Sequence, residues 1–323
     1  MINIAILGAG RIAKSMAKTV NGMKEANLYG IASRTIEKAL EFAEEFHIEH
    51  AYGSYEEMVK DPNIDLVYIA TPHSHHYEYS MLCLEHGKHV LCEKAFTANA
   101  KQAKEVLSFA KEKGLLITEA IWSRYMPMAK TIKDLIVDGV IGEVHTLHSD
   151  FGARNFNVPR MSKPELAGGA LLDLGIYPLT FAAITFGLDI EDIKTTAILN
   201  EYGVDAQHSI ILKYKDNKLA TLNSSMLSKM ESRAVVYGSE GYFVVKGMTN
   251  YESIEIYNNA NELIKTIHRP EQITGYEYEV LAAIKAIKDG ELECPQMPHD
   301  ETIRMMEFMD QLRKMWGVHY PFD

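Results

Sequence analysis

A short glycine loop near the N-terminus has the composition of a phosphate-binding turn. The segment Gly8-Ala9-Gly10-Arg11-Ile12-Ala13 follows an apolar run, precedes a helical pattern and matches G-x-G-x-x-A. Gly8 permits a tight turn, Gly10 lets the backbone approach a pyrophosphate, and Ala13 allows close helix–strand packing. Because the helix N-terminus then faces the anion, we predict a dinucleotide site. A glycine turn without a ligand is the alternative. The expected cofactor contacts in this loop are Gly8, Gly10, Arg11 and Ile12.

The end of the second predicted strand bears on which dinucleotide is bound. An acidic residue there accepts from the ribose hydroxyls. Here the chain reads Ala32-Ser33-Arg34-Thr35, which offers a hydroxyl and a guanidinium instead. Arginine binds phosphate bidentately, so Ser33 and Arg34 favour NADP over NAD. Lys38, one turn into the next helix, adds a positive charge, although a solvated lysine is the ordinary interpretation.

Three histidines follow the third predicted strand of this half, in Thr71-Pro72-His73-Ser74-His75-His76. Ligands of doubly wound folds bind at the carboxyl edge of the sheet, where this segment lies. We expect a wall of the cofactor site formed by Thr71, Pro72, His73 and His76. A metal site is the alternative, but no H-E-x-x-H and no second ligand cluster accompany the histidines, so we expect no metal.

Glu93-Lys94 ends the next predicted strand at the same sheet edge. We expect both residues to adjoin the cofactor, although Lys94 as a surface charge is the alternative. Desolvation and a neighbouring cation would lower the pKa of this lysine, which would let it donate to a substrate hydroxyl or orient it.

An acid and a phenol begin a later helical pattern, in Gly168-Gly169-Ala170-Leu171-Leu172-Asp173-Leu174-Gly175-Ile176-Tyr177. Residues four apart on a helix share one face, so Asp173 and Tyr177 would lie together. If buried, both need partners, which a substrate with several hydroxyls supplies. A capping aspartate and a core tyrosine with a satisfied hydroxyl are the alternative.

The first 120 residues alternate short apolar runs with helical patterns, which is typical of a parallel sheet with crossover helices. The predicted strands are Ile2–Leu7, Leu28–Ser33, Leu66–Ala70, His89–Cys92 and Leu115–Thr118. The predicted helices are Ile12–Val20, Thr35–Phe46, His75–His86 and Asn99–Glu112. We therefore predict an α/β fold whose residues 1–121 form a doubly wound, Rossmann dinucleotide-binding domain.

After about Trp122 this rhythm stops, and residues 122–323 are predicted to form an α+β domain that binds substrate. One helix, Leu171–Phe186, precedes hairpins at Ser209–Tyr214 with Leu219–Met226 and around Gly238–Gly241, which favour an antiparallel sheet. Two late helices are expected at Tyr276–Lys288 and Asp300–Trp316. The second of these helices carries Met305, Met309, Leu312 and Trp316 on one face, and we interpret this apolar stripe as core packing.

Composition limits the partners. The 323 residues carry 33 Lys and Arg against 44 Asp and Glu, a formal charge of −11. That balance disfavours attachment to nucleic acid or to an anionic membrane, because phosphate binding depends on clustered basic residues. The three cysteines, Cys83, Cys92 and Cys294, form no C-x-x-C pair or disulfide framework. Since no bilayer-spanning or signal segment is evident either, we expect a cytoplasmic protein.

Together, the glycine loop, Glu93-Lys94 and the segment from Gly168 to Tyr177 resemble the Gfo/Idh/MocA oxidoreductase family. Within it the sequence looks like the branch that oxidises trans-dihydrodiols and aldoses. Three further stretches support that branch: Ala51-Tyr52-Gly53-Ser54-Tyr55-Glu56-Glu57, Glu119-Ala120-Ile121-Trp122 and Asp150-Phe151-Gly152.

The resemblance implies hydride transfer between NADP and a sugar or cyclic diol carbon. In the oxidative direction, Tyr177 would take the hydroxyl proton while Lys94 lowers its pKa and holds the oxygen, and Asp173 would orient the substrate or the lysine. Trp122 and Phe151 would line the substrate pocket. A large, mostly antiparallel open sheet would make a homodimer, or a dimer of dimers.

Two features depart from the family pattern. Ala95 follows Lys94 where the family usually has proline, which removes a restraint on φ. Many members also carry histidine at the position of Tyr177, so the substrate does not transfer from distant relatives. A second hypothesis is a ligand sensor that binds NADP without turnover; the presence of both Lys94 and Tyr177 argues for an enzyme.

Overall fold

The computed structural model describes residues 1–323 and divides them into two compact units. The first unit comprises Met1–Tyr125 and Gln272–Glu307, and the second comprises Met126–Glu271 and Phe308–Asp323. This division differs from the single boundary predicted after residue 121. The chain returns to the first unit because helix α9 (Glu277–Asp289) packs against strand β5 (His89–Glu93) of its sheet.

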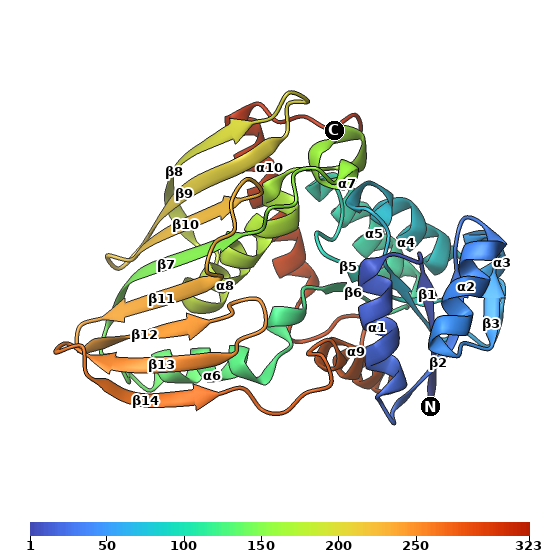
Figure 1. Cartoon of the computed structure of the whole chain (residues 1–323), viewed down its shortest axis with the longest axis horizontal. Coiled ribbons are helices and arrows are strands. Elements are labelled where there is room, and N and C mark those ends of the chain that lie inside the picture. The colour runs from blue at the N-terminus through green and yellow to red at the C-terminus, as the bar shows by residue number, and fades with distance from the viewer. The chain divides into compact units, whose positions relative to one another are not determined.

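The first unit is built on a parallel sheet with the strand order β3-β2-β1-β4-β5-β6 (Figure 1). Besides β5, its strands are β1 (Ile2–Leu7), β2 (Ala26–Ala32), β3 (His50–Tyr52), β4 (Leu66–Ile69) and β6 (Ile117–Ala120). Chain order reverses between β1 and β4, as in a doubly wound fold. The predicted strands are confirmed within about two residues at each end. Only β3 was not predicted, since three residues give too short a pattern.

Helices connect these strands where the periodicity predicted them. They are α1 (Arg11–Asn21), α2 (Ile36–Phe46), α4 (His76–Glu85) and α5 (Ala100–Lys113), together with the unpredicted single turn α3 (Tyr55–Met58). The ends follow local chemistry: Asn99 caps α5 by accepting from Gln102 N at 3.0 Å, and Gly114 ends it with φ 67°.

The second unit contains an eight-stranded sheet in the order β14-β13-β12-β11-β7-β10-β9-β8, antiparallel except where β10 and β7 pair in parallel. Its strands are β7 (Val144–Gly152), β8 (Ile190–Leu199), β9 (Asp205–Tyr214), β10 (Leu219–Ser225), β11 (Arg233–Gly238), β12 (Gly241–Lys246), β13 (Ser253–Asn258) and β14 (Leu263–His268). Both predicted hairpins are confirmed, and the fold class is the predicted α/β fold with a large, mostly antiparallel sheet.

Helix α8 (Ile176–Phe186) packs against β7 and β10, and α6 (Pro127–Val137) packs against α8 (Figure 1). The predicted helix Leu171–Phe186 begins differently from expectation, because Leu171–Gly175 is a π-helical turn. The segment Pro164–Phe186 is long and apolar enough to span a bilayer by length and composition, but 89% of its most apolar window is buried inside the protein. The apolar character of this segment is therefore explained by its burial in the core of the protein.

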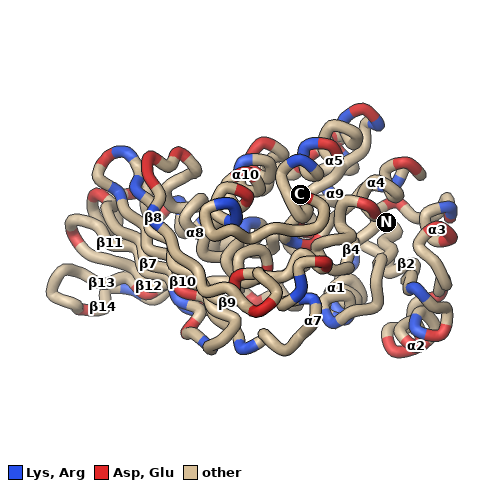
Figure 2. The backbone as a smooth tube through the Cα atoms, turned by 90° about the horizontal axis from the view of Figure 1, so that it is seen from above, with Lys and Arg blue, Asp and Glu red and all other residues tan.

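Helix α10 (His299–Trp316) carries the predicted apolar stripe. Met305, Met309 and Leu312 are at most 2% exposed, which confirms the core interpretation for these three, whereas Trp316 is half-buried. Acidic and basic residues are interspersed along the elements rather than gathered on one of them (Figure 2).

Candidate active site

The glycine loop has the geometry that a bound pyrophosphate requires. Gly8 has φ +104°, which L side chains rarely adopt, and a Cβ there would lie 3.1 Å from the carbonyl oxygen of Ala70. Gly10 precedes the first residue of α1, so the backbone N–H groups of the first helical turn point out of the helix end. A side chain at position 8 would crowd the backbone of Ala70 at the end of β4, so this turn requires glycine.

Thr71 adjoins this loop from the end of β4. Its methyl carbon would be 3.4 Å from a Cβ at Gly8, and its hydroxyl is buried without a hydrogen-bond partner in the protein. A buried hydroxyl of this kind requires a partner, which an oxygen of a bound dinucleotide supplies. The residues at this edge therefore fit the predicted cofactor.

Ser33 and Arg34 follow β2 directly, at the same carboxyl edge. Ser33 is 6% exposed and its N–H donates to the carbonyl oxygen of Tyr52 at 3.2 Å, whereas Arg34 is exposed. Lys38 is exposed on α2, one turn further on. No carboxylate occupies the position that would accept from a ribose hydroxyl.

His76 bridges two loops of the site. Its Nδ1 lies 2.8 Å from the carbonyl oxygen of Ala95, and its Nε2 lies 2.9 Å from that of Thr71. Burial lowers the pKa of His76 to about 4, so the ring is neutral at pH 7 and donates to only one of these carbonyls. The adjacent His73 is 5% exposed, with its ring 5.7 Å from that of His76. The structure gathers no three metal-ligating side chains into one group.

Glu93 and Lys94 stand at the carboxyl end of β5, as predicted. The Lys94 N–H donates to Glu93 Oε2 at 3.2 Å, and the Lys94–Ala95 peptide bond is cis. Glu93 Oε1 accepts a short hydrogen bond from the hydroxyl of Tyr68, which is fully buried in β4. The backbone at Lys94 is thereby tied to a carboxylate held by the core.

A second acid, Glu279 of α9, is buried in the same unit. It is 0% exposed and neither carboxyl oxygen has a hydrogen-bond partner in the protein. Burial, and secondarily the charge of Glu93, raises the pKa of Glu279 well above its usual range. Burial therefore favours the protonated, neutral form of this carboxyl group.

A third acid, Glu119 of β6, holds the backbone that follows Lys94. Its Oε1 accepts from the Phe96 N–H at 3.0 Å, and the residue is 1% exposed. Burial raises the pKa of the carboxyl group to about 8. Folded protein therefore retains, at pH 7, a proton that the unfolded chain releases near pH 4.5.

Glu119→Gln is expected to stabilise the protein at alkaline pH. Because the folded pKa is raised, the wild-type free energy of unfolding falls as the pH rises from about 4.5 to 8, and glutamine lacks this dependence. The free energy of unfolding of the variant should exceed that of the wild type by on the order of 3 kcal/mol at pH 8. Urea denaturation at pH 5 and pH 8 measures it, with exposed Glu112→Gln as the control. If the difference in free energy of unfolding between the variant and the wild type were the same at pH 5 and pH 8, Glu119 would already be ionised at pH 5.

Trp122 forms an aromatic stack with a residue that sequence reasoning missed. Its ring lies 4.2 Å from that of Tyr276, with the planes 11° apart, and Trp122 is 9% exposed. Tyr276 precedes α9, about 150 residues later in the chain. The one sequence signal at Tyr276 was a tyrosine beside Gly275 at the start of a helical pattern.

In the second unit, Asp173 lies in the π-turn and is 6% exposed. Its Oδ1 accepts from Arg160 Nη1 at 3.0 Å, and Arg160 comes from the short helix α7 (Pro159–Ser162). The four-residue spacing to Tyr177 thus crosses from a π-turn into α8, so the α-helical spacing rule used above does not hold over this step. Arg160 carried no motif that would have singled it out.

Tyr177 is the second residue of α8 and is half-buried. Its ring meets that of Phe151, from the end of β7, edge to face at 5.4 Å. The predicted neighbours Phe151, Asp173 and Tyr177 all belong to the second unit, and Lys94 and Trp122 to the first. The pairing of Lys94 with Tyr177 stays a prediction.

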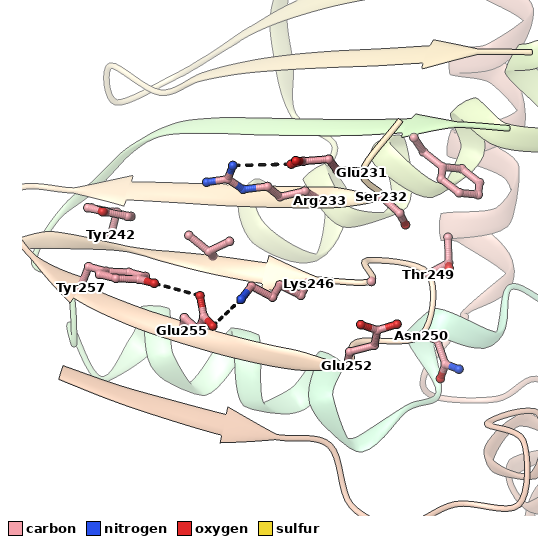
Figure 3. Close-up of a pocket in the computed structure, with 13 residues that line it drawn as sticks. Glu231, Ser232, Arg233, Tyr242, Lys246, Thr249, Asn250, Glu252, Glu255 and Tyr257 are labelled. Carbon is pink, nitrogen blue, oxygen red and sulfur yellow. Dashed lines mark hydrogen bonds and ion pairs between the residues drawn. The ribbon is translucent and has the colours of Figure 1, made fainter. Parts of the chain in front are cut away.

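The second unit also contains an open cavity of about 820 Å³ on the face of the sheet at β12 and β13, beside the start of β11 (Figure 3). Four of its charged groups form two ion pairs: Arg233 with Glu231 at 3.7 Å, and Lys246 with Glu255, which also accepts from Tyr257. Of the predicted site residues only Phe151 lines it. The cavity is therefore not the site that the motifs predict.

Two family models match the chain. The oxidoreductase family with an NAD-binding Rossmann fold matches residues 2–121, and the GFO/IDH/MocA C-terminal domain matches residues 129–244. Among solved structures, the 3-ketoreductase KijD10 from Actinomadura kijaniata, in complex with NADP and TDP-benzene, aligns with a TM-score of 0.88 over 97% of both chains at 24% identity. Levoglucosan dehydrogenase in complex with NADH and L-sorbose aligns with a TM-score of 0.86 over 98% and 97% at 17% identity. These two likenesses show the fold.

Curated relatives are similar over their whole length. The trans-1,2-dihydrobenzene-1,2-diol dehydrogenases of Xenopus tropicalis and Mus musculus are each 32% identical over 98% of both chains. The chain therefore belongs to the Gfo/Idh/MocA family of NAD(P)-binding oxidoreductases, in the branch of the trans-1,2-dihydrobenzene-1,2-diol dehydrogenases.

Proposed function

We propose that this protein transfers hydride between NADP and a hydroxyl-bearing carbon of a sugar, polyol or trans-dihydrodiol. One observation carries the proposal: a glycine loop shaped for pyrophosphate shares its sheet edge with Lys94, in a chain whose relatives are diol dehydrogenases. The levoglucosan dehydrogenase complex supports the inclusion of sugars.

NADP is proposed over NAD. The exposed guanidinium of Arg34 and the hydroxyl of Ser33 would hold the 2′-phosphate, with Lys38 adding charge. The pyrophosphate would lie against the loop at Gly8 and Gly10. When bound, the nicotinamide supplies the hydride acceptor or donor.

Lys94 and Tyr177 are proposed as the acid/base pair. In the oxidative direction, the phenolic oxygen of Tyr177 takes the proton of the substrate hydroxyl, and the ammonium of Lys94 stabilises the phenolate and holds the substrate oxygen. The anchors of Lys94 fit this role, because the carboxyl groups of Glu93 and Glu119 accept backbone hydrogen bonds on either side of the Lys94–Ala95 bond.

The remaining residues would bind substrate. Asp173 would accept from a substrate hydroxyl while Arg160 stabilises its charge. Trp122, with Tyr276 stacked on it, and Phe151 would cover the apolar faces of a sugar or a cyclic diol.

The experiment is the initial rate of NADP and of NAD reduction, followed by nicotinamide absorbance, across aldoses, inositols and trans-dihydrodiols. Oxidation of at least one compound, faster with NADP, is the expected result. If no compound is oxidised while NADPH still binds, the activity proposal fails and the cofactor-binding sensor takes its place. Faster turnover with NAD would overturn the role of Arg34.

We also propose that a second copy of the chain covers the open face of the large sheet, giving a homodimer or a dimer of dimers. That face carries an aromatic row across four strands, in which the rings of His148, Tyr237, Tyr242 and Tyr257 lie 5.8, 5.5 and 4.9 Å apart. Tyr237 is 38% exposed and Ile211, further along the sheet, is 42% exposed. Exposed apolar patches of this kind mark interfaces.

Sedimentation should therefore give a particle of twice or four times 36.4 kDa for the wild type. Tyr237→Glu should dissociate it, because a buried unpaired carboxylate opposes association. Val137→Glu, at the exposed end of α6, is the matched control and should sediment like the wild type. A monomeric wild type would contradict the interface.

We also propose that the protein is cytoplasmic. Its three cysteines are free, buried thiols, which supports a location in a reducing compartment.

A further inference from the structure

Two polar side chains lie buried beneath the π-turn that carries Asp173, and neither was singled out by the sequence. Asp205 is the first residue of β9 and is 0% exposed, and His208, three residues on, is 5% exposed. His208 Nδ1 lies 2.9 Å from Asp205 Oδ2, so the ring donates from Nδ1 to the carboxylate. The pair belongs to the same unit as Tyr177.

The pair holds the start of the helix directly. Asp205 Oδ2 also accepts from the backbone N–H of Leu171, the first residue of the π-turn, at 2.8 Å. That N–H is among the groups left without a partner inside a helix, so the aspartate caps a turn that lacks a local side-chain cap.

Glycines on either side of the turn make room for the two side chains. A Cβ at Gly169 would lie 2.3 Å from Asp205 Oδ1, and a Cβ at Gly175 would lie 2.8 Å from the His208 ring. Since Gly169 also has φ +124°, its backbone conformation itself favours glycine. The backbone therefore packs closely against Asp205 just before the π-turn and against His208 at its last residue.

Two aromatic residues near the C-terminus, Trp316 and Tyr320, also pack around this region. The ring of Trp316 stacks on His208 at 5.0 Å, with the planes 21° apart, and its Nε1 donates to Thr195 Oγ1 at 3.0 Å. The Tyr320 hydroxyl donates to the Gly168 carbonyl at 2.7 Å. His208 is therefore held by Asp205 at Nδ1 and by Trp316 on one face of its ring.

We propose that Asp205 and His208 are positioning residues for the reaction: they fix the register of the π-turn and so the placement of Asp173 and of the Tyr177 hydroxyl. This rests on the proposed function of Tyr177. A displacement of about 1 Å of a reacting group costs up to about 100-fold in rate. The residues proposed to bind the cofactor belong to the other unit.

Two substitutions of His208 by amide side chains of similar size, asparagine and glutamine, test its contact with Asp205. The nitrogen of His208→Asn falls near the ring Nδ1 and keeps a donor to Asp205, whereas that of His208→Gln falls near Nε2 and does not. We expect kcat to fall about 30-fold in His208→Gln and less than about 3-fold in His208→Asn, with unchanged NADPH affinity. Asp205→Asn should resemble His208→Gln. Ile210→Val, in the same strand and facing the core, controls for lost stability.

Equal kcat values for His208→Asn and His208→Gln, or a loss of kcat in Ile210→Val that matches its loss of Tm, would overturn the positioning role and leave a purely structural pair. Failure of the proposed function is distinct, because it would appear as a wild type that oxidises nothing, or as a Tyr177→Phe protein with wild-type turnover.

Discussion

Tyr177→Phe is expected to reduce kcat by about 1,000-fold and to leave the Kd for NADPH unchanged. The substitution removes only the hydroxyl, and the edge-to-face contact with Phe151 at 5.4 Å involves the ring and is retained. Positioned acid/base groups contribute about 10² to 10⁴ to the rate, which sets the size of the loss. Steady-state turnover of the best substrate measures kcat, and NADPH fluorescence titration measures Kd.

Tyr29→Phe provides the control for this change. Its hydroxyl also donates to a side chain, Asp61 at 3.1 Å, but the residue lies in β2, outside the π-turn and the proposed interface. The control should retain wild-type kcat. If Tyr177→Phe also retained it, the phenol would have no part in proton transfer and a different base would have to be sought.

Lys94→Met should have an effect of similar size, with a second signature in the pH profile. Without the ammonium, a phenol is harder to ionise, so the pKa of the base rises and the remaining activity needs more alkaline solution. We expect kcat/KM to fall by about 1,000-fold at pH 7 and its acidic limb to move to higher pH. Turnover from pH 6 to 10 tests both.

Lys111→Met, an exposed lysine in the last turn of α5, is the matched control and should leave the profile in place. A Lys94→Met protein with lowered turnover but an unmoved acidic limb would argue that the lysine only places the substrate. The pairing with Tyr177 would then be wrong, even though the residue matters.

Much of the first unit was predictable from the sequence, because its strands and helices are specified by local patterns. The apolar run Ile2–Leu7 and the glycine loop after it reappear as β1 and the start of α1. The return of Gln272–Glu307 to this unit was not predictable, since a helix pattern such as that of α9 shows which face is apolar but not which sheet it covers.

The candidate residues that stand in motifs lie at the predicted edge of the sheet, as Thr71 after β4 and Lys94 after β5 show. The parts that depend on tertiary contacts were not predicted. Tyr276 stacks on Trp122, and Arg160 meets Asp173, only because distant segments fold together. Neither residue stands in a motif, and a lone arginine or tyrosine reads as an ordinary surface or core residue.

The π-turn shows why spacing alone was insufficient around Tyr177. A regular helix was predicted from the apolar pattern, yet Leu171–Gly175 is a π-helical turn whose first N–H donates to Asp205. Asp205 lies 34 residues further along the chain, in β9, and carries no helical signal of its own.

The central claim, hydride transfer by this protein, is tested most directly with NADPH deuterated at nicotinamide C4, in both stereochemical forms, and the carbonyl product of the best substrate. The wild type should place one deuterium on the carbinol carbon from one form only, seen by mass spectrometry, and Tyr177→Phe should transfer none above background in the same time. NADPH binding without label in any carbonyl compound would contradict the account.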